Sequence, residues 1–85
     1  MQITIRYFAA LREALNMGQE QLSLPAEVRT VGALRQHLLA RGEPWASALA
    51  AHRAVRMALN QDMAQASTPL VDGAEVAFFP PVTGG

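Results

Sequence analysis

The sequence predicts an α+β fold in which a mixed sheet packs against helices, followed by a flexible tail that ends in Gly-Gly. Segments with the alternating pattern of a strand lie near both ends of the chain, and segments with helical spacing lie between them. Of the 85 residues, 51% are hydrophobic and only 16% are charged, which is enough apolar material for one core. We therefore expect one domain over residues 1–79 and a reactive tail over residues 80–85.

The first strand runs directly into the first helix. Residues 2–8 alternate in the manner of a strand that has one buried face. Residues 9–16 then change to helical spacing, since Leu11 and Leu15 lie four apart, and Gly18 just beyond can end the helix. The buried face of the strand is expected to hold Ile3, Ile5 and Tyr7.

A second strand and the main helix come next. Residues 21–24 have strand character and are closed by Pro25. Thr30 suits the N-cap of the main helix, because its hydroxyl can accept a backbone N–H that the helix leaves unpaired. Gly42 is expected to end this helix. The apolar face of the helix consists of Val31, Leu34 and Leu38.

The chain then predicts a short helix and a third strand. Pro44 suits the first turn of the helix, in which Trp45 and Leu49 lie four apart. Alternation over residues 55–59 indicates a strand that breaks at residues 60–62. Core filling is expected of two methionines, Met57 and Met63.

The last strand covers residues 75–79, after a turn signal at Asp72-Gly73, and stops at Pro80. Between the third and last strands the chain reads as irregular. One arrangement that fits these elements is the ubiquitin-like β-grasp, in which the first and last strands pair in parallel at the centre of the sheet. The core face of the last strand is expected to hold Val76 and Phe78.

Phe8 and Phe79 are candidates for a partner-binding surface. Both lie on the outward faces of the first and last strands, so pairing of these strands brings the two rings onto one exposed surface near the tail. Exposed aromatic side chains often supply much of the binding free energy of an interface. The alternative is that one ring tucks under a loop and completes the core. Arg12, one helical turn after Phe8, is either a charged contact at the rim of this surface or a solvated helix residue.

The composition excludes several classes of protein. Without cysteine there is no disulfide scaffold, cysteine-based zinc site or thiol nucleophile, and two histidines are too few for an ordinary catalytic metal site. Seven basic residues, all of them arginine, balance seven acidic ones, which leaves no basic surface for nucleic acid or a membrane. Arg6 interrupts the N-terminal apolar pattern, so it is no signal peptide, and no uncharged segment approaches the ~20 residues of a membrane span. A soluble cytoplasmic protein is expected.

The tail is the part of the chain that is suited to chemistry. Pro80 and Pro81 favour an extended backbone that cannot add to a sheet. Gly84 and Gly85 lack side chains and can pass through a narrow channel. Fully extended, residues 80–85 reach ~20 Å, which is enough to insert the terminus into another protein. Packing and hydrogen bonding can anchor the tail through Val82 and Thr83.

A free carboxylate is a poor electrophile, so Gly85 must be activated before it reacts. An ATP-using partner can adenylate it, and a sulfur donor can then convert it to a thiocarboxylate whose sulfur is nucleophilic at neutral pH. The alternative is an inert, frayed end. At ~7% glycine, a chain ends in Gly-Gly by chance about once in two hundred cases.

Four segments resemble the small subunit of molybdopterin synthase, a family of sulfur carriers with the ubiquitin-like β-grasp fold. The most specific segment is residues 75–85, with the sequence Glu-Val-Ala-Phe-Phe-Pro-Pro-Val-Thr-Gly-Gly. The other three are residues 7–13, 30–38 and 58–61. The similarity covers essentially the whole chain.

The resemblance implies a chain that is not an enzyme on its own but the sulfur-donating subunit of a sulfurtransferase. In this family an enzyme that resembles the ubiquitin-activating enzyme uses ATP to adenylate the terminal glycine, and a sulfurtransferase system makes the thiocarboxylate. The tail then enters the large synthase subunit, in a heterotetramer, and gives sulfur to cyclic pyranopterin monophosphate to form the dithiolene of molybdopterin.

The resemblance also implies roles for individual residues. By position, Gly85 bears the sulfur and Gly84 lets it reach the active site. Phe8, Arg12 and Phe79 match the hydrophobic and charged contacts that the family makes with its partners. The chain itself is expected to bind no cofactor and no metal.

Three alternatives stay open on the sequence alone. A thiamine-type sulfur carrier has the same fold and also ends in Gly-Gly, although its members tend to be shorter and lack the Phe-Phe-Pro-Pro approach. A ubiquitin-like protein modifier joins its terminus to lysines of target proteins. A plain interaction domain has an inert terminus.

Overall fold

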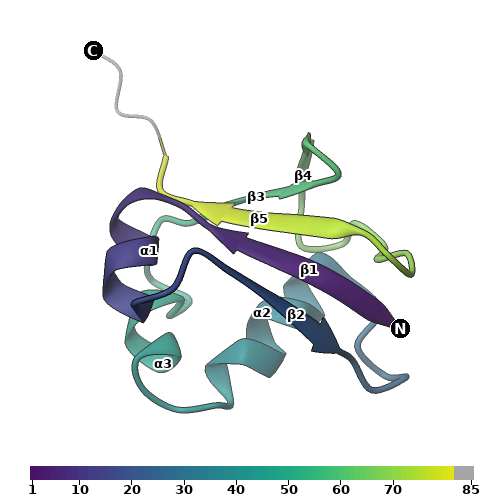
Figure 1. Cartoon of the computed structure of the whole chain (residues 1–85), viewed down its shortest axis with the longest axis horizontal. Coiled ribbons are helices and arrows are strands. Elements are labelled where there is room, and N and C mark those ends of the chain that lie inside the picture. Colours follow the sequence, from purple (N-terminus) through teal and green to yellow (C-terminus); the bar gives the residue numbers. More distant parts are fainter. Residues whose placement is uncertain (82–85) are drawn as a thin grey trace.

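A computed structural model of the chain describes residues 1–81 (Figure 1). In this part of the chain, one mixed sheet of five strands has the order β2-β1-β5-β3-β4, and β1 and β5 run parallel at its centre. Figure 1 shows the helices gathered on one side of the sheet, as in the ubiquitin-like β-grasp, so the predicted fold class is confirmed. The elements are β1 (Gln2–Tyr7), α1 (Ala9–Leu15), β2 (Gln19–Ser23), α2 (Val31–Leu39), α3 (Trp45–Ala48), β3 (Arg56–Leu59), β4 (Asp62–Ala64) and β5 (Glu75–Phe79).

The two faces of the central strands differ as the alternation predicts. Ile3, Ile5 and Tyr7 of β1 are buried against the helices, and Val76 and Phe78 of β5 join them. The rings of Tyr7 and Phe78 stack with their centroids 6.1 Å apart. Because β1 pairs with β2 on one side and with β5 on the other, its core-facing side chains lie at the middle of the core.

Helix α1 ends differently from the prediction. Its C-cap is Asn16, which adopts the left-handed conformation with φ 56°, so the backbone reverses before Gly18 is reached. Gly18 has no left-handed φ and lies at the entrance of β2. Asparagine tolerates this conformation better than most residues, because its short polar side chain can hydrogen-bond locally. The prediction that Gly18 ends the helix is therefore wrong.

Helix α2 begins as predicted. The Thr30 hydroxyl accepts a hydrogen bond from the Ala33 N–H at 3.1 Å, and this contact caps the helix. The first turn is also held by the loop that follows β4, since Gly32 N–H donates to the Ala66 carbonyl at 2.9 Å. The buried face of the helix consists of Val31, Leu34 and Leu38.

Strand β4 was not predicted, because the segment after β3 read as irregular. Asn60 and Gln61 have φ values of 48° and 71°, so they form a two-residue turn that folds the chain back on β3 as a hairpin. Asn60 also joins this turn to β5: its N–H donates to the Glu75 carbonyl, and its side-chain oxygen accepts from the Glu75 N–H. Strand β2 begins two residues earlier than expected, at Gln19.

A polar cluster connects β1 and β2 to the helices. The Tyr7 hydroxyl donates to Glu20 at 2.8 Å and accepts from the Trp45 indole N–H at 3.3 Å. Arg41 makes two hydrogen bonds to the Glu20 carboxylate, at 3.0 and 2.9 Å, and lies over the Trp45 ring. Burial, together with the neighbouring Glu20 carboxylate, raises the pKa of Tyr7 well above its ordinary value of about 10, and the hydrogen bond from Trp45 only partly opposes this shift.

Candidate functional site

The tail leaves the domain at the end of β5. Pro80 and Pro81 follow Phe79 directly and are partly exposed. The parallel pairing of β1 and β5 puts this exit at the same end of the sheet as Phe8, away from Met1. Four residues that were predicted to form the reactive arm lie outside the described residues: Val82, Thr83, Gly84 and Gly85.

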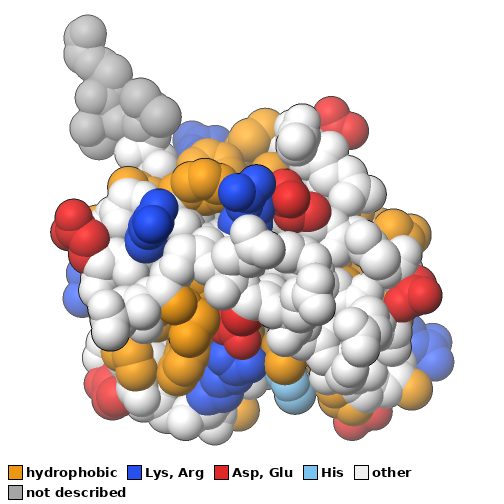
Figure 2. Space-filling model, in the orientation of Figure 1, with side chains coloured by type: hydrophobic (Ala, Val, Ile, Leu, Met, Phe, Trp, Pro, Cys, Tyr) orange, Lys and Arg blue, Asp and Glu red, His pale blue; other side chains and the backbone are white. Residues whose placement is uncertain are grey.

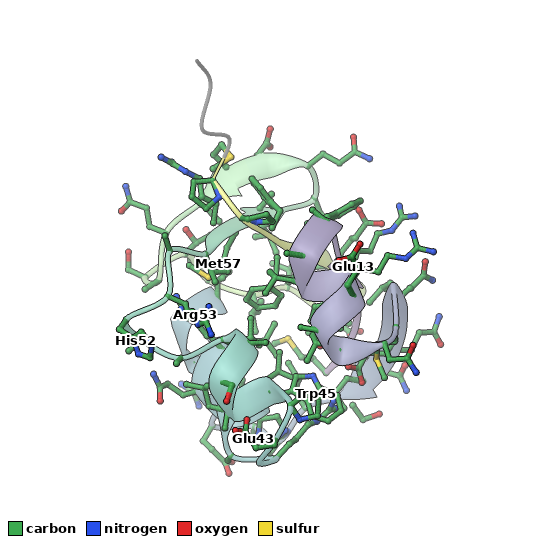
Figure 3. The ribbon with its side chains drawn as sticks, turned by 90° about the vertical axis from the view of Figure 1, so that its left-hand side faces the viewer. Glu13, Glu43, Trp45, His52, Arg53 and Met57 are labelled. Atoms are coloured by element: carbon green, nitrogen blue, oxygen red, sulfur yellow. The ribbon has the colours of Figure 1, made fainter. Side chains whose placement is uncertain are left out.

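Two shallow grooves flank the base of the tail. Pro80 borders a groove between α1, α3 and the loop before β3, whereas Pro81 borders a groove along β3 and β4. Figure 3 looks at this end of the molecule and shows Arg53 and Met57 between α3 and the tail. One arginine lies in the wall of each groove: Arg53 in the groove beside Pro80 and Arg56 in the groove beside Pro81.

Phe8 continues the line of β1 past its last paired residue. Its backbone is extended (φ −123°, ψ 155°), and its N–H donates to the Phe78 carbonyl at 3.1 Å. The side chain is 43% exposed, so this phenylalanine does not complete the core. Phe79 is half-buried on the same outward face, where it pairs in register with Arg56 of β3. The predicted placement of both rings on one exposed face of the sheet agrees with the structure.

Charged side chains border Phe8. Arg6, two residues earlier on the outward face, lies with its guanidinium carbon 5.9 Å from the centre of the Phe8 ring. The same arginine approaches the Glu75 carboxylate at 3.7 Å across the β1–β5 pair. Both charged groups are partly solvated, so this ion pair contributes little to stability. It does orient Arg6 beside the aromatic ring.

Met63 extends the exposed apolar surface across the sheet. It was expected in the core, but it is 62% exposed, and that prediction is wrong. The hairpin turn sets a register in which Met63 pairs with Ala58 on the outward face, and Ala58 in turn pairs with Ala77 of β5. We call the resulting surface the outer apolar patch. Figure 2 shows hydrophobic and basic side chains next to one another on the surface below the tail. The patch consists of Phe8, Met63, Ala77 and Phe79, which lie around Ala58, an outward-facing residue that is itself buried.

Arg12 lies one turn into α1, and its N–H contacts the Phe8 carbonyl at 3.5 Å. Its side chain is exposed and lies across the backbone of Gly18. It takes part in neither of the two ion pairs found within residues 1–81, which join Arg6 to Glu75 and Arg41 to Glu20. Arg12 is thus free to bind an acidic group of another molecule.

Neither a metal-binding cluster nor a membrane-spanning helix is found in the described part of the chain. Within residues 1–81 no group of three or more His, Asp or Glu side chains is placed to hold a metal ion. None of the helices there has the length and apolarity needed to cross a bilayer. The most strongly engaged arginine, Arg35, serves the fold: it donates three hydrogen bonds to the carbonyls of Leu49, Ala50 and Arg53. Burial lowers the pKa of Arg35.

The geometry is that of a small β-grasp domain whose outer apolar patch and tail share one end, and comparison with known proteins identifies the family. The model of the ThiS family matches residues 5–85. The chain belongs to the ThiS family. This match covers the tail as well as the domain.

Two curated relatives of this ThiS-family chain bear the same name, molybdopterin synthase sulfur carrier subunit. The protein from Escherichia coli (strain K12) is 45% identical over 83 residues, which are 98% of this chain and 99% of the relative. The protein from Haemophilus influenzae is 36% identical over the same shares of the two chains. Both names describe a carrier subunit, in agreement with the prediction that the chain is not an enzyme on its own.

Solved structures agree with the fold. A putative molybdopterin converting factor, subunit 1, from Pyrococcus furiosus has a TM-score of 0.78 and 25% identity, with 96% of this chain and 99% of the other covered. A protein–protein complex of subunits 1 and 2 of the molybdopterin-converting factor from Helicobacter pylori contains a chain with a TM-score of 0.66 and 23% identity, and both chains are covered completely.

Proposed function

We propose that this ThiS-family chain is the sulfur-carrier subunit of a molybdopterin synthase. The observation that carries the proposal is the 45% identity, over nearly the full length, to a relative of that name. The architecture supports it, because Pro80 and Pro81 follow the last strand at the same end of the sheet as the exposed Phe8.

The chemistry resides at Gly85. The terminal carboxylate attacks the α-phosphorus of ATP in an activating partner, pyrophosphate leaves, and an acyl adenylate forms. A sulfurtransferase system then supplies sulfur that displaces AMP and leaves a thiocarboxylate. When this group gives its sulfur to cyclic pyranopterin monophosphate, water restores the carboxylate, and two deliveries complete the dithiolene of molybdopterin. The chain needs no cofactor of its own, because ATP is used by the partner.

The β-grasp domain positions the tail on the large subunit. The outer apolar patch docks on the large subunit, and the exit at Phe79 directs the tail into the active site of that subunit. Pro80 and Pro81 have no N–H to give, so they cannot extend the β5 ladder and keep the tail separate from the sheet. Val82 and Thr83 anchor the tail in the entry channel of the large subunit by packing and hydrogen bonding, and Gly84 lets the terminus pass the constriction.

Three partners follow from this proposal: the large synthase subunit, an adenylating enzyme that resembles the ubiquitin-activating enzyme, and a sulfurtransferase system. The Helicobacter pylori complex of subunits 1 and 2 supports the first of them. We place the working assembly in the cytoplasm as a heterotetramer with two carrier chains and two large subunits.

Reconstitution with the large subunit tests the proposal. The full chain, loaded by the adenylating enzyme and a sulfur donor, is expected to convert cyclic pyranopterin monophosphate to molybdopterin. The chain lacking Gly85 is expected to form none, although its thermal unfolding is unchanged. A matched control, Val71→Ala, changes an exposed side chain at the opposite end of the sheet and is expected to remain fully active. Molybdopterin formation by the truncated chain would contradict the proposal.

The same preparation separates the alternatives. Capture of a thiazole synthase instead of the large subunit would indicate a thiamine-type carrier. Adducts of the chain on target lysines that survive reductant would indicate a protein modifier. If the terminus carries no sulfur and deletion of Gly85 leaves the binding of every partner unchanged, the chain is a plain interaction domain.

A further inference from the structure

The Arg12 side chain rests on Gly18. A Cβ built on Gly18 with ideal geometry would lie 3.1 Å from Arg12 Nε, 3.2 Å from Cζ and 3.4 Å from Cδ. The two shorter distances are tighter than nearly all real Cβ contacts, so a methyl group at this position requires the Arg12 side chain to shift by a few tenths of an ångström. The guanidinium occupies the space that a side chain of residue 18 would take.

Conformation does not explain a glycine at this position. The left-handed glycines in residues 1–81 are Gly42 and Gly73, whereas the turn after α1 is made by Asn16. The backbone at position 18 is therefore open to alanine, and the close approach of the Arg12 side chain is the feature of this position that a methyl group would disturb.

Gly18 is itself held firmly against the sheet. Its carbonyl accepts a hydrogen bond from the Tyr7 N–H at 3.0 Å, next to Phe8 in the chain. Tyr7 is buried and fixed by its hydrogen bonds to Glu20 and Trp45. An arginine side chain that lies on Gly18 therefore rests on a rigid part of the molecule, close to the outer apolar patch.

We propose that Gly18 is a positioning residue: by leaving room for the Arg12 guanidinium, it holds this group at the edge of the outer apolar patch, where it binds a carboxylate of the large subunit. The inference rests on the proposed function. A planar guanidinium binds a carboxylate through two parallel N–H donors, so its orientation matters as well as its charge. With a methyl group at residue 18, the guanidinium must shift by a few tenths of an ångström, which disturbs the bidentate geometry.

A double-mutant cycle on large-subunit binding tests this role. The dissociation constant is measured by calorimetry for the wild-type chain, Arg12→Ala, Gly18→Ala and the double variant. Loss of one charge-assisted contact is expected to weaken binding about tenfold in Arg12→Ala. Gly18→Ala is expected to weaken it on the order of threefold, because the charge stays but the geometry of the contact is disturbed. In the Arg12→Ala background, Gly18→Ala is expected to have no further effect.

Two additional measurements separate positioning from folding. The matched control is Gln21→Ala, which changes an exposed residue of β2, the strand that follows Gly18, and it is expected to bind like the wild type. In NMR spectra of the full wild-type chain, the Arg12 Nε proton is expected to show a nuclear Overhauser effect to the Gly18 α-protons, and its absence would overturn the inference without any variant.

Each outcome of the cycle is decisive. Equal weakening by Gly18→Ala in both backgrounds would show that the methyl group acts through the backbone and would overturn the inference. Wild-type affinity of Gly18→Ala, or of Arg12→Ala, would also overturn it while leaving the sulfur-carrier function intact. That function fails by a different result: no binding of the wild-type chain to the large subunit.

Discussion

Truncation of Phe8 measures how much the outer apolar patch contributes to binding. A phenylalanine exposes ~200 Å² when fully accessible. With 43% of it exposed, about 85 Å² of Phe8 is left for a partner to cover. At ~25 cal/mol per Å², complete burial of that area contributes ~2 kcal/mol to association. Since ~1.4 kcal/mol is a factor of ten, we expect Phe8→Ala to weaken large-subunit binding about ten- to thirtyfold.

The same substitution is expected to leave the fold almost intact. The Phe8 backbone keeps its hydrogen bond to Phe78, and the contact with Arg6 that is lost is partly solvated and worth less than about 1 kcal/mol. Phe78→Ala, by contrast, removes a fully buried ring and is expected to cost ~3–5 kcal/mol of unfolding free energy.

Calorimetric titration of the large subunit and urea unfolding followed by Trp45 fluorescence, the signal of the one tryptophan, provide the two readouts. Val71→Ala, 51% exposed at the other end of the sheet, is the matched control and is expected to change neither. Wild-type affinity of Phe8→Ala would refute the assignment of this face to partner binding. Unfolding of Phe8→Ala under native conditions would refute its placement outside the core.

Two further predictions concern the fold. Gly32→Ala should lower the unfolding free energy by about 1–3 kcal/mol in urea titrations. The new Cβ would lie 2.8 Å from Ala66 Cβ and 2.9 Å from the Ala66 carbonyl oxygen, and this clash outweighs the helix-propensity gain of about 1 kcal/mol. A more stable variant would contradict this packing. Tyr7, the one tyrosine, should ionise in the folded chain well above pH 10, because burial raises its pKa. The unfolded chain loses this proton near pH 10, so the contribution of Tyr7 to stability is expected to be constant below that pH and to be lost as pH rises beyond it. Tyrosinate absorbance measures this titration, and an ordinary value in the native protein would contradict the buried hydrogen-bonded hydroxyl.

The buried faces of the sheet and of the main helix could be predicted because each rests on local periodicity. Ile5, Val31 and Phe78 are fully buried where the alternation or the helical spacing placed them. The Thr30 cap is equally local, since its hydroxyl reaches an N–H only three residues ahead. The parallel pairing of β1 and β5 joins segments about 70 residues apart in the chain. The order of the elements indicated it only as one arrangement that fits, and the family resemblance implied it.

The wrong predictions depended on contacts that no local pattern contains. Met63 is apolar and follows a strand, but the turn at Asn60-Gln61 sets a hairpin register that directs it outward. Two non-glycine residues with positive φ made this turn hard to recognise, although the strand pattern before it and a polar pair in the middle were available signals. Gly18 looked like a helix stop, but Asn16 ends the helix, and the structure instead places the Arg12 side chain against Gly18.

The predictions for the candidate site also divide into those that the local pattern supported and those that it did not. Phe8 and Phe79 lie on one outward face as the strand pattern predicted, whereas their role in binding stays a prediction. Met63 was missed as a member of the outer apolar patch. The assignment of sulfur chemistry to Gly85 came from the resemblance of the tail, and it also stays a prediction, because residues 82–85 lie outside the described part of the chain.

The mass of the intact chain, purified after co-expression with its adenylating enzyme and sulfur donor, tests sulfur loading most directly. We expect a species in which one oxygen has been replaced by sulfur, and we expect fragmentation to place the replacement at Gly85. The chain without Gly85 should show none of this species. A chain co-expressed with both partners in which the terminal carboxylate keeps both oxygens, while molybdopterin is still formed, would contradict the account.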